Sequence, residues 1–244
     1  MRSSLATMPA RKTEEDLSWF EFALVLRDAM QQGEPFDLAI LDMHMPGMDG
    51  AMLAKAIREG VRPDKSVIGP PMPIESYRHM ADDDLAAVIA YLRTRTAVKN
   101  TVPRSTYRIP VPTSYGPPVG KVKAPAPRDK LAYGKYLVEI GHCMECHTPV
   151  NEKGELLVAK LGAGGQVIEG PWGKTVSRNL TPTGLKDWTD AQIAKAIRSG
   201  VDRNGQPYRP PMAYEFYKNI NDADIAAIIA YLRSLKPQPT GGTG

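Results

Sequence analysis

The sequence predicts an all-α protein, and three observations support this fold class. Apolar residues recur at helical spacing, most clearly at Ile225, Ile228, Ile229 and Leu232. Capping signals flank such segments, and one stretch of 43 residues occurs twice in the chain. The 22 prolines favour short helices joined by stiff connections.

The helices can be placed in chain order. We expect a first helix near Leu17 to Met30, in an N-terminal stretch that is otherwise poorly ordered, and another at Tyr133 to Gly141. Thr189 with Gln192 predicts a capping box that opens a helix through Ile193, Ala196 and Ile197, which Gly200 can end. Asn221 or Asp222 can cap the last helix.

The repeat is exact in register. Residues 51–93 align without gaps to residues 191–233 at an offset of 140, with 22 identities over 43 positions. Pro70-Pro71-Met72 thereby matches Pro210-Pro211-Met212, and Ile89 to Arg93 matches Ile229 to Arg233. Chance does not produce such a run, so we infer that the two segments descend from one ancestral unit.

Cys143, Cys146 and His147 form a C-x-x-C-H motif, the spacing that attaches haem covalently. Two thiols one helical turn apart can each add to a vinyl group of a porphyrin. The histidine that follows then projects an imidazole onto the iron. The motif predicts one covalently bound haem c with iron as its metal.

Two other interpretations of the cysteine pair remain open. A structural zinc site needs four N or S ligands, but the chain has no further cysteine and only His44, His79 and His142 besides His147. A thioredoxin-like dithiol would follow a strand in a βαβ pattern, whereas the segment before Cys143 shows helical spacing.

The haem interpretation requires a second iron ligand well downstream, and Met212 meets that requirement. It follows two prolines, which remove backbone donors and stiffen an extended approach. A thioether opposite an imidazole favours reduced iron and suits an electron carrier. The alternative is an ordinary core residue, since the chain has 11 methionines.

The stretch from about Ala132 to Lys236 resembles a class I cytochrome c domain, of the kind found in diheme cytochrome subunits that take electrons from periplasmic dehydrogenases. The matching motifs include Tyr133 to Leu137, Gly141 to Pro149, Gly170-Pro171-Trp172-Gly173, Ser177 to Pro182, Pro210-Pro211-Met212 and Asp224 to Arg233.

The resemblance implies a role for each matching residue. Cys143 and Cys146 would carry the thioethers, with His147 as proximal and Met212 as distal ligand. The first and last helices would cross where Gly134 lets Tyr231 approach. The carbonyl of Pro149 could orient His147. Trp172, Arg178 and Asn179 could donate to haem propionates, although a buried tryptophan and a solvated arginine are equally ordinary.

The N-terminal segment resembles a different family. Phe36 to Gly50 is similar to the third strand and phosphoacceptor loop of a response-regulator receiver domain, in which Asp42 would accept a phosphoryl group. The chain supplies neither the acidic pair that holds magnesium nor the later hydroxyl residue and lysine. We therefore interpret the segment as a relic of a fusion.

These patterns divide the chain into five parts. We expect a receiver-like fragment at 1–50, a truncated cytochrome c-like repeat without a haem site at 51–94, a linker at 95–128, a cytochrome c domain at 129–238 and a flexible tail at 239–244. The offset places the missing C-x-x-C-H near residues 3–7, which contain no cysteine. Met72 would then pack as an ordinary apolar side chain.

Charge and hydropathy limit the partners. Residues 95–128 carry seven basic side chains, no acidic one and seven prolines, which predicts an extended segment that lies across an acidic surface or holds two domains apart. Two aromatics in that segment give little support for nucleic-acid binding. No stretch approaches the roughly 20 apolar residues of a membrane span. The N-terminus shows no secretory signal, although haem attachment implies the periplasm.

We expect an electron-transfer protein and no catalytic residues. It would pass single electrons from a dehydrogenase to a downstream cytochrome or oxidase of a respiratory chain. The alternative is a redox-linked signalling protein with Asp42 as phosphoacceptor.

Overall fold

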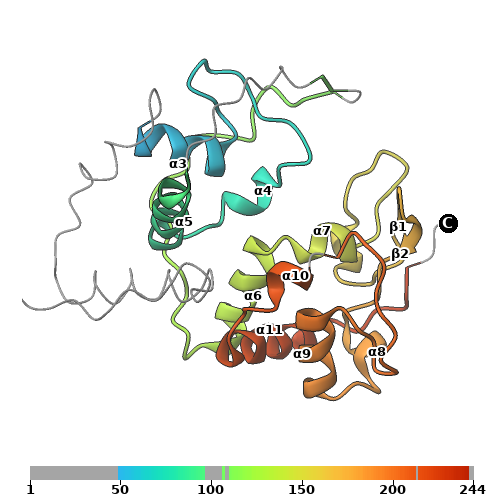
Figure 1. The fold of residues 1–244 in the computed structure, drawn as a ribbon. Helices are drawn as coiled ribbons and strands as arrows, with labels where there is room; N and C mark the ends of the chain where they lie inside the picture. The colour runs from blue at the N-terminus through green and yellow to red at the C-terminus, as the bar shows by residue number, and fades with distance from the viewer. Residues whose placement is uncertain (1–48, 97–105, 108–109, 213, 242–244) are drawn as a thin grey trace, which may run out of the picture.

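The computed structural model describes residues 49–96, 106–107, 110–212 and 214–241. Its helices form two groups (Figure 1). The N-terminal unit, residues 49–94, holds α3 (Gly50–Glu59), α4 (Ile74–Tyr77) and α5 (Asp82–Thr94). Asp49 caps α3 by accepting a hydrogen bond from the amide of Met52 at 2.6 Å. The predicted helix at Leu17 to Met30 lies outside the described residues.

The C-terminal unit, residues 129–241, holds most of the secondary structure. Its elements are α6 (Lys130–Ile140), α7 (Cys143–His147), the 3-10 turn η1 (Val158–Lys160), β1 (Val167–Gly170), β2 (Gly173–Val176), α8 (Pro182–Leu185), α9 (Asp190–Ser199), α10 (Tyr214–Tyr217) and α11 (Asp222–Ser234).

The antiparallel hairpin β1–β2 corrects the all-α prediction, although the chain is mostly helical. Gly170 pairs with Gly173 across the turn, and Gly173 has a φ of 91°, which glycine adopts readily. The ring of Trp172 lies so close to Gly170 that a Cβ atom there would be 2.4 Å away. Glycine at both positions therefore permits the turn.

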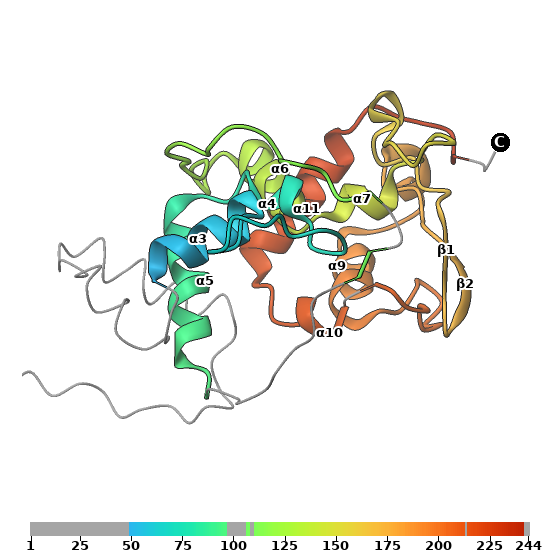
Figure 2. The ribbon, with the colours of Figure 1, turned by 90° about the horizontal axis from the view of Figure 1, so that it is seen from above.

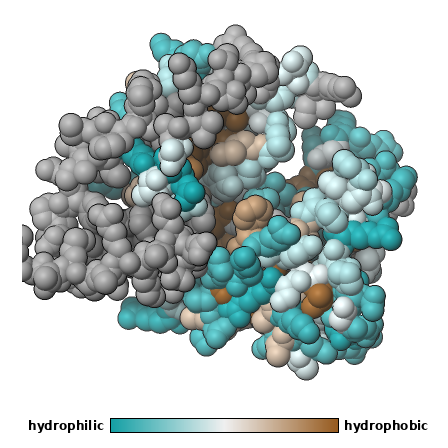
Figure 3. All heavy atoms as spheres, in the orientation of Figure 1, coloured by the Kyte–Doolittle hydropathy of each residue, from teal (hydrophilic) through white to brown (hydrophobic). Residues whose placement is uncertain are grey.

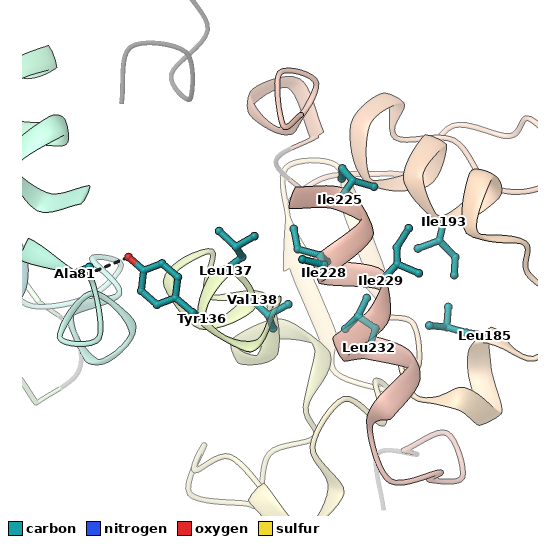
Figure 4. Close-up of a cluster of buried hydrophobic side chains, with 11 residues drawn as sticks. Ala81, Tyr136, Leu137, Val138, Leu185, Ile193, Ile225, Ile228, Ile229 and Leu232 are labelled. Atoms are coloured by element: carbon teal, nitrogen blue, oxygen red, sulfur yellow. Dashed lines mark hydrogen bonds between the residues drawn. The ribbon is translucent and has the colours of Figure 1, made fainter. Parts of the chain in front are cut away.

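The core of the C-terminal unit is built on the crossing of α6 and α11. A Cβ atom on Gly134 would lie 2.0 Å from the carbonyl oxygen of Ala227 and 3.0 Å from Cβ of Tyr231, which confirms the predicted close approach. Apolar side chains of both helices meet those of α8 and α9 beneath this crossing (Figure 4), among them Leu137, Val138, Leu185, Ile193, Ile225, Ile229 and Leu232.

The local signals at helix ends are confirmed. Thr189 and Gln192 form both hydrogen bonds of a capping box on α9, and Gly200 ends that helix with a left-handed φ of 62°. Asn221, and not Asp222, caps α11 by accepting from the amide of Asp224 at 2.9 Å.

The structure repeats itself at the offset found in the sequence. Helices α3, α4 and α5 correspond residue for residue to α9, α10 and α11. Gly60 ends α3 in the left-handed conformation as Gly200 ends α9. Because the helix bounds and this glycine cap both repeat, the two copies share one local fold and not only a sequence pattern.

The two units contact each other directly. The hydroxyl of Tyr136 on α6 accepts a hydrogen bond from the amide of Ala81 at 3.1 Å and donates to Asp84. Figure 4 shows Tyr136 pointing from α6 toward Ala81. Ser76 of α4 donates to Oε1 of Glu145 in α7 at 2.6 Å. Seen from above, α4 lies beside α6 and α7 (Figure 2).

The linker packs against the N-terminal unit. The hydroxyl of Tyr115 donates to the carbonyl of Ile68 at 2.9 Å, and the amide of Val119 donates to Glu59 at 2.8 Å. Further along, the amide of Asp82 donates to the carbonyl of Val122 at 2.9 Å. The described part of the linker therefore lies along the N-terminal unit, as in the first of the two expected arrangements.

The last described residues are also held in place. The amide of Gly241 donates to the carbonyl of Ala163 at 3.0 Å. The expectation of a flexible tail at 239–244 stays a prediction. On the face drawn in Figure 3, the C-terminal unit is mostly hydrophilic, with hydrophobic residues scattered singly. No helix within the described ranges has the length and apolar character needed to cross a bilayer.

Candidate functional site

The site is centred on α7, which presents the C-x-x-C-H residues on little more than one helical turn. His142 precedes it in a left-handed conformation, with a φ of 44°, so the chain turns sharply out of α6. Cys143 and Cys146 are both free thiols and both half-buried. The turn therefore places two thiols three positions apart on one side of the helix.

Burial disfavours ionisation of both thiols. It raises the pKa of Cys143 to about 11, with the charges of Cys146 and Glu145 adding to the effect. The pKa of Cys146 is also raised, first by burial and then by Glu145. A dithiol redox protein needs a nucleophilic thiolate, which a lowered pKa supplies. This environment does the opposite and does not suit the dithiol interpretation.

His147 is fixed by the backbone of a distant segment. Its Nδ1 lies 2.7 Å from the carbonyl oxygen of Arg178, and because a carbonyl only accepts, Nδ1 carries the proton. The lone pair is then on Nε2, ready to bind a metal. Burial lowers the pKa of His147, while the bond to Arg178 raises it, so the ring favours the neutral form.

The residue that orients His147 is therefore not the one expected. The carbonyl of Pro149 accepts from the amide of Leu157 at 2.8 Å and so serves the loop after α7. Arg178, 31 positions downstream of His147, supplies the acceptor instead. A contact so distant in sequence leaves no signal in the local pattern around the motif.

Arg178 also connects to the segment that carries Met212. Its guanidinium lies over the ring of Tyr208, 5.1 Å from the centroid. Thr175 of β2 donates to the carbonyl of Pro210 at 2.8 Å. Met212 itself is half-buried, two residues before α10. Residues 208–212, which carry Met212, therefore contact β2 and Arg178, and Arg178 in turn contacts His147 of α7.

Helix α10 closes the same region from the other side. The hydroxyl of Tyr217 donates to the carbonyl of Gly141, just before α7, at 3.4 Å. Burial raises the pKa of Tyr217, and the charges of Cys143 and Cys146 raise it further. Sequence reasoning missed Tyr217, although its identity with Tyr77 at the offset of 140 was available as a signal.

Trp172 holds an unpaired donor. Its indole Nε1 is buried and has no hydrogen-bond partner among the described residues. A buried N–H without an acceptor costs free energy, so such a group indicates an acceptor that is not among the described residues. An oxygen-bearing ligand beside Trp172 would satisfy it.

Asn179 differs from the expectation. Its amide nitrogen donates to the carbonyl of Gln238 at 2.9 Å and to Oγ1 of Thr240 at 3.4 Å. Its Oδ1 accepts from the amide and the hydroxyl of Thr181 at 2.8 and 2.7 Å. These contacts use both hydrogens of the amide, so Asn179 has no donor left for a cofactor.

A further residue unnoticed in the sequence fixes the end of α7. Nε2 of Gln166 donates to the carbonyls of Glu145 and Thr148 at 2.7 and 2.6 Å. The last carbonyls of a helix lack partners within it, so this side chain satisfies two of them. No motif marks a lone glutamine, and only the fold identifies it.

The counterpart of Met212 in the N-terminal unit has other surroundings. Met72 is half-buried and lines an open cavity of about 340 Å³ with Arg62, Tyr107 and the adjacent prolines. The expectation that it packs as an ordinary apolar side chain stays a prediction. Asp42 lies outside the described residues.

The described ranges also bear on the zinc interpretation. Within them, no three side chains of His, Cys, Asp or Glu are grouped closely enough to share a metal ion. The donors that α7 itself carries are instead two thiols and one imidazole, and Met212 is on a separate segment before α10. This set suits a metal held mainly by a prosthetic group.

Comparison with known proteins gives consistent matches. The family model of cytochrome c matches residues 131–236. A diheme cytochrome c-type protein of Cereibacter sphaeroides is 32% identical over 206 residues, which cover 79% of this chain and 67% of that protein. The fructose dehydrogenase cytochrome subunit of Gluconobacter japonicus is 29% identical over 205 residues, or 78% of this chain and 41% of that one.

A further relative has a similar description. The cytochrome c subunit of a quinone alcohol dehydrogenase from Gluconobacter oxydans is 29% identical over 212 residues, covering 77% of this chain and 43% of the subunit. The chain thus spans less than half the length of these two dehydrogenase subunits.

Proposed function

The chain belongs to the cytochrome c family, and from that premise we propose that it carries single electrons between a dehydrogenase and a respiratory acceptor through one covalent haem c. The observation that carries the proposal is the hydrogen bond between His147 and the backbone of Arg178. Nδ1 of His147 is occupied by the carbonyl of Arg178, which leaves Nε2 free for iron. When bound, the haem iron supplies the one-electron redox couple.

Cys143 and Cys146 would hold the haem through thioether bonds. Both are free, half-buried and one helical turn apart on α7. Their raised pKa values fit thiols that stay protonated until the haem is attached. Two covalent bonds and a ligand on one short helix fix the group in orientation as well as position.

Met212 would supply the second protein ligand of the iron, a thioether sulfur. Its loop is held to β2 through Thr175 and to Arg178 through Tyr208. These contacts support a preset position for the thioether, which raises the reduction potential relative to harder ligands. The role of this chain is to hold the two ligands and exclude water.

Trp172 and Arg178 remain candidates for contact with the haem propionates. The orphaned indole N–H of Trp172 is the stronger of the two, because a carboxylate would satisfy it. The guanidinium of Arg178 lies over the ring of Tyr208, and its positive charge would attract a propionate. Asn179 is withdrawn from this set, since its donors are used within the chain.

The partners follow from the relatives. Two of them are named as cytochrome subunits of a fructose dehydrogenase and of a quinone alcohol dehydrogenase. We place this chain beside such an enzyme, which would oxidise the substrate while the cytochrome passes its electrons to a downstream cytochrome or oxidase. Haem attachment of this type takes place after export, so the working compartment would be the periplasm.

The N-terminal unit fits a truncated cytochrome c-like repeat without a haem. Its helices match α9 to α11, and the sequence has no cysteine before Cys143. The receiver-like segment around Asp42 remains a sequence prediction. Labelling with a small acyl phosphate tests it, because a phosphoacceptor would incorporate phosphate that Asp42→Ala loses.

A redox titration followed by absorbance tests the proposed function. One haem with one-electron chemistry predicts a single wave with the slope of a one-electron couple and reversible spectra. Two waves would show a second haem, and the absence of a haem spectrum in protein matured by competent machinery would overturn the proposal.

A further inference from the structure

We propose that the end of the chain, residues 238–241, positions His147 by holding the carbonyl that accepts its proton. This inference rests on the proposed function, in which His147 binds iron. Residues 238–241 contact neither His147 nor the proposed distal loop in any interaction described above. They act through two intervening segments, 163–165 and 178–181.

The first step concerns the peptide between Arg178 and Asn179, which presents the carbonyl to His147. Gly164 packs directly against it, since a Cβ atom there would lie 2.6 Å from the carbonyl oxygen of Arg178. The amide of Gly164 also donates to the carbonyl of His147 at 2.8 Å. The position of the Arg178 carbonyl therefore depends on segment 163–165 as well as on segment 178–181, to which it belongs.

The second step joins the chain end to segment 178–181. The amide of Gln238 donates to Oγ1 of Thr181 at 3.2 Å, and its carbonyl accepts from Asn179 at 2.9 Å. Thr181 is fully buried, and its hydroxyl also donates to Oδ1 of Asn179 at 2.7 Å. Gln238 and the Asn179–Thr181 pair thus form a closed hydrogen-bonded set.

The third step joins the chain end to the other segment. The amide of Gly241 donates to the carbonyl of Ala163 at 3.0 Å, beside Gly164. Gly165 faces Gly241 so closely that a Cβ atom would lie 1.7 Å from the carbonyl oxygen. Pro237 and Pro239 restrict the backbone on both sides of Gln238, so little entropy is lost in holding it.

These steps give residues 238–241 a specific function. They clamp together the two segments that enclose the Arg178 carbonyl, and that carbonyl sets the plane and tautomer of the His147 imidazole. Loosening the clamp should change the ligand's orientation and electron donation to iron before it unfolds the domain. Thr181 is the positioning residue that can be altered with least change in shape.

The test compares Thr181→Val with Thr181→Ser in the full haem-loaded protein. Valine keeps the volume but removes the hydroxyl, whereas serine keeps the hydroxyl. For Thr181→Val we expect a changed electron paramagnetic resonance g-tensor of the ferric haem and a shifted reduction potential. The His147 ring N–H should also exchange with solvent about fivefold faster or more, because the loss of one hydrogen bond corresponds to about that factor and the Thr181 hydroxyl makes two. Thr181→Ser should restore all three.

Thr189→Val is the matched control. It removes a threonine hydroxyl that caps α9 and so lowers stability without a link to Arg178. If Thr189→Val moves the g-tensor and the exchange rate as much as Thr181→Val does, the effect is general destabilisation and the proposal is wrong.

A chain ended after Pro237 gives a second, independent variant. It should change the His147 spectra in the same direction as Thr181→Val and by at least as much, because it removes the contact of Gln238 with Thr181 and also those of Gln238 with Asn179 and of Gly241 with Ala163. An unchanged His147 signature in the shortened chain would also overturn the proposal. Haem content is measured in every sample first, so a failure to bind haem, which would contradict the proposed function, is distinguished from a failure of the clamp.

Discussion

The imidazole of His147 donates from Nδ1 to the carbonyl oxygen of Arg178 across 2.7 Å, while the guanidinium of the same arginine lies over Tyr208. Tyr208 is four residues before Met212 in the chain. A single residue between β2 and α8 therefore contacts both the proposed proximal ligand and the loop of the proposed distal ligand. The following predictions concern the two ligands and the frame that holds them.

Replacement of Met212 by alanine should remove the sulfur ligand and lower the reduction potential, because the thioether stabilises reduced iron. The ferric absorption band characteristic of sulfur ligation should disappear. Met72→Ala is the matched control at the offset of 140 and should leave the spectrum unchanged. A retained low-spin spectrum with an unaltered potential in Met212→Ala would mean that another group binds iron.

Replacement of Trp172 by phenylalanine should affect haem-loaded protein through the indole N–H. The N–H is buried without a partner among the described residues, so its loss removes a desolvation cost from a chain without haem. If a propionate accepts it, the potential shifts and the loaded protein loses about 1–2 kcal/mol of stability. A gain in stability of loaded protein, measured by thermal unfolding, would exclude that contact.

Alanine at position 134 should force α6 and α11 apart, since the new methyl group would meet the carbonyl of Ala227 at 2.0 Å. We expect a loss of about 1–3 kcal/mol, the usual cost of overpacking. Chemical denaturation followed by circular dichroism measures it. Gly120→Ala, where no atom lies within 4 Å of the added group, is the control and should cost nothing. Equal stability of the two variants would contradict the described crossing.

Alkaline stability should depend on Tyr136. Its pKa is raised well above 10, first by burial and then by the charge of Asp84. The stabilisation is complete below pH 10 and is lost as the pH rises, because the unfolded chain then releases the phenolic proton. Each pH unit above 10 should cost about 1.4 kcal/mol.

Tyr136→Phe provides the check on that slope. Denaturation midpoints measured between pH 9 and 11 should fall less steeply in the variant, because the loss of stability that comes from ionisation of Tyr136 is then absent. The variant should also be less stable at neutral pH by about 1–3 kcal/mol, because Ala81 and Asp84 lose their shared partner. Identical slopes in both proteins would show that Tyr136 ionises freely in the folded state.

The sequence was sufficient for features that depend on local chemistry. The capping box of Thr189, the left-handed Gly200 and the helical spacing around Ile228 are each decided within a few residues, so they could be predicted. The repeat in the sequence also predicted a repeat in the structure, because the offset of 140 relates the helix bounds as well as the residues.

The features that were missed depend on distant contacts. The acceptor for His147 is 31 residues away along the chain. Asn179 donates to Gln238, which is 59 residues downstream. The hairpin leaves a weak signal in the sequence because β1 and β2 are only four residues each. The contact of Tyr136 with the N-terminal unit could not be foreseen, since no pattern within α6 distinguishes its two buried faces.

The central claim is that Cys143 and Cys146 hold one haem by covalent bonds, and mass spectrometry of denatured protein tests it most directly. Protein produced with intact maturation machinery should have the mass of the chain plus one haem, carried on the peptide that contains Cys143 to His147. Both cysteines should resist alkylation. A mass equal to that of the bare chain, with two thiols free to react, would contradict the account.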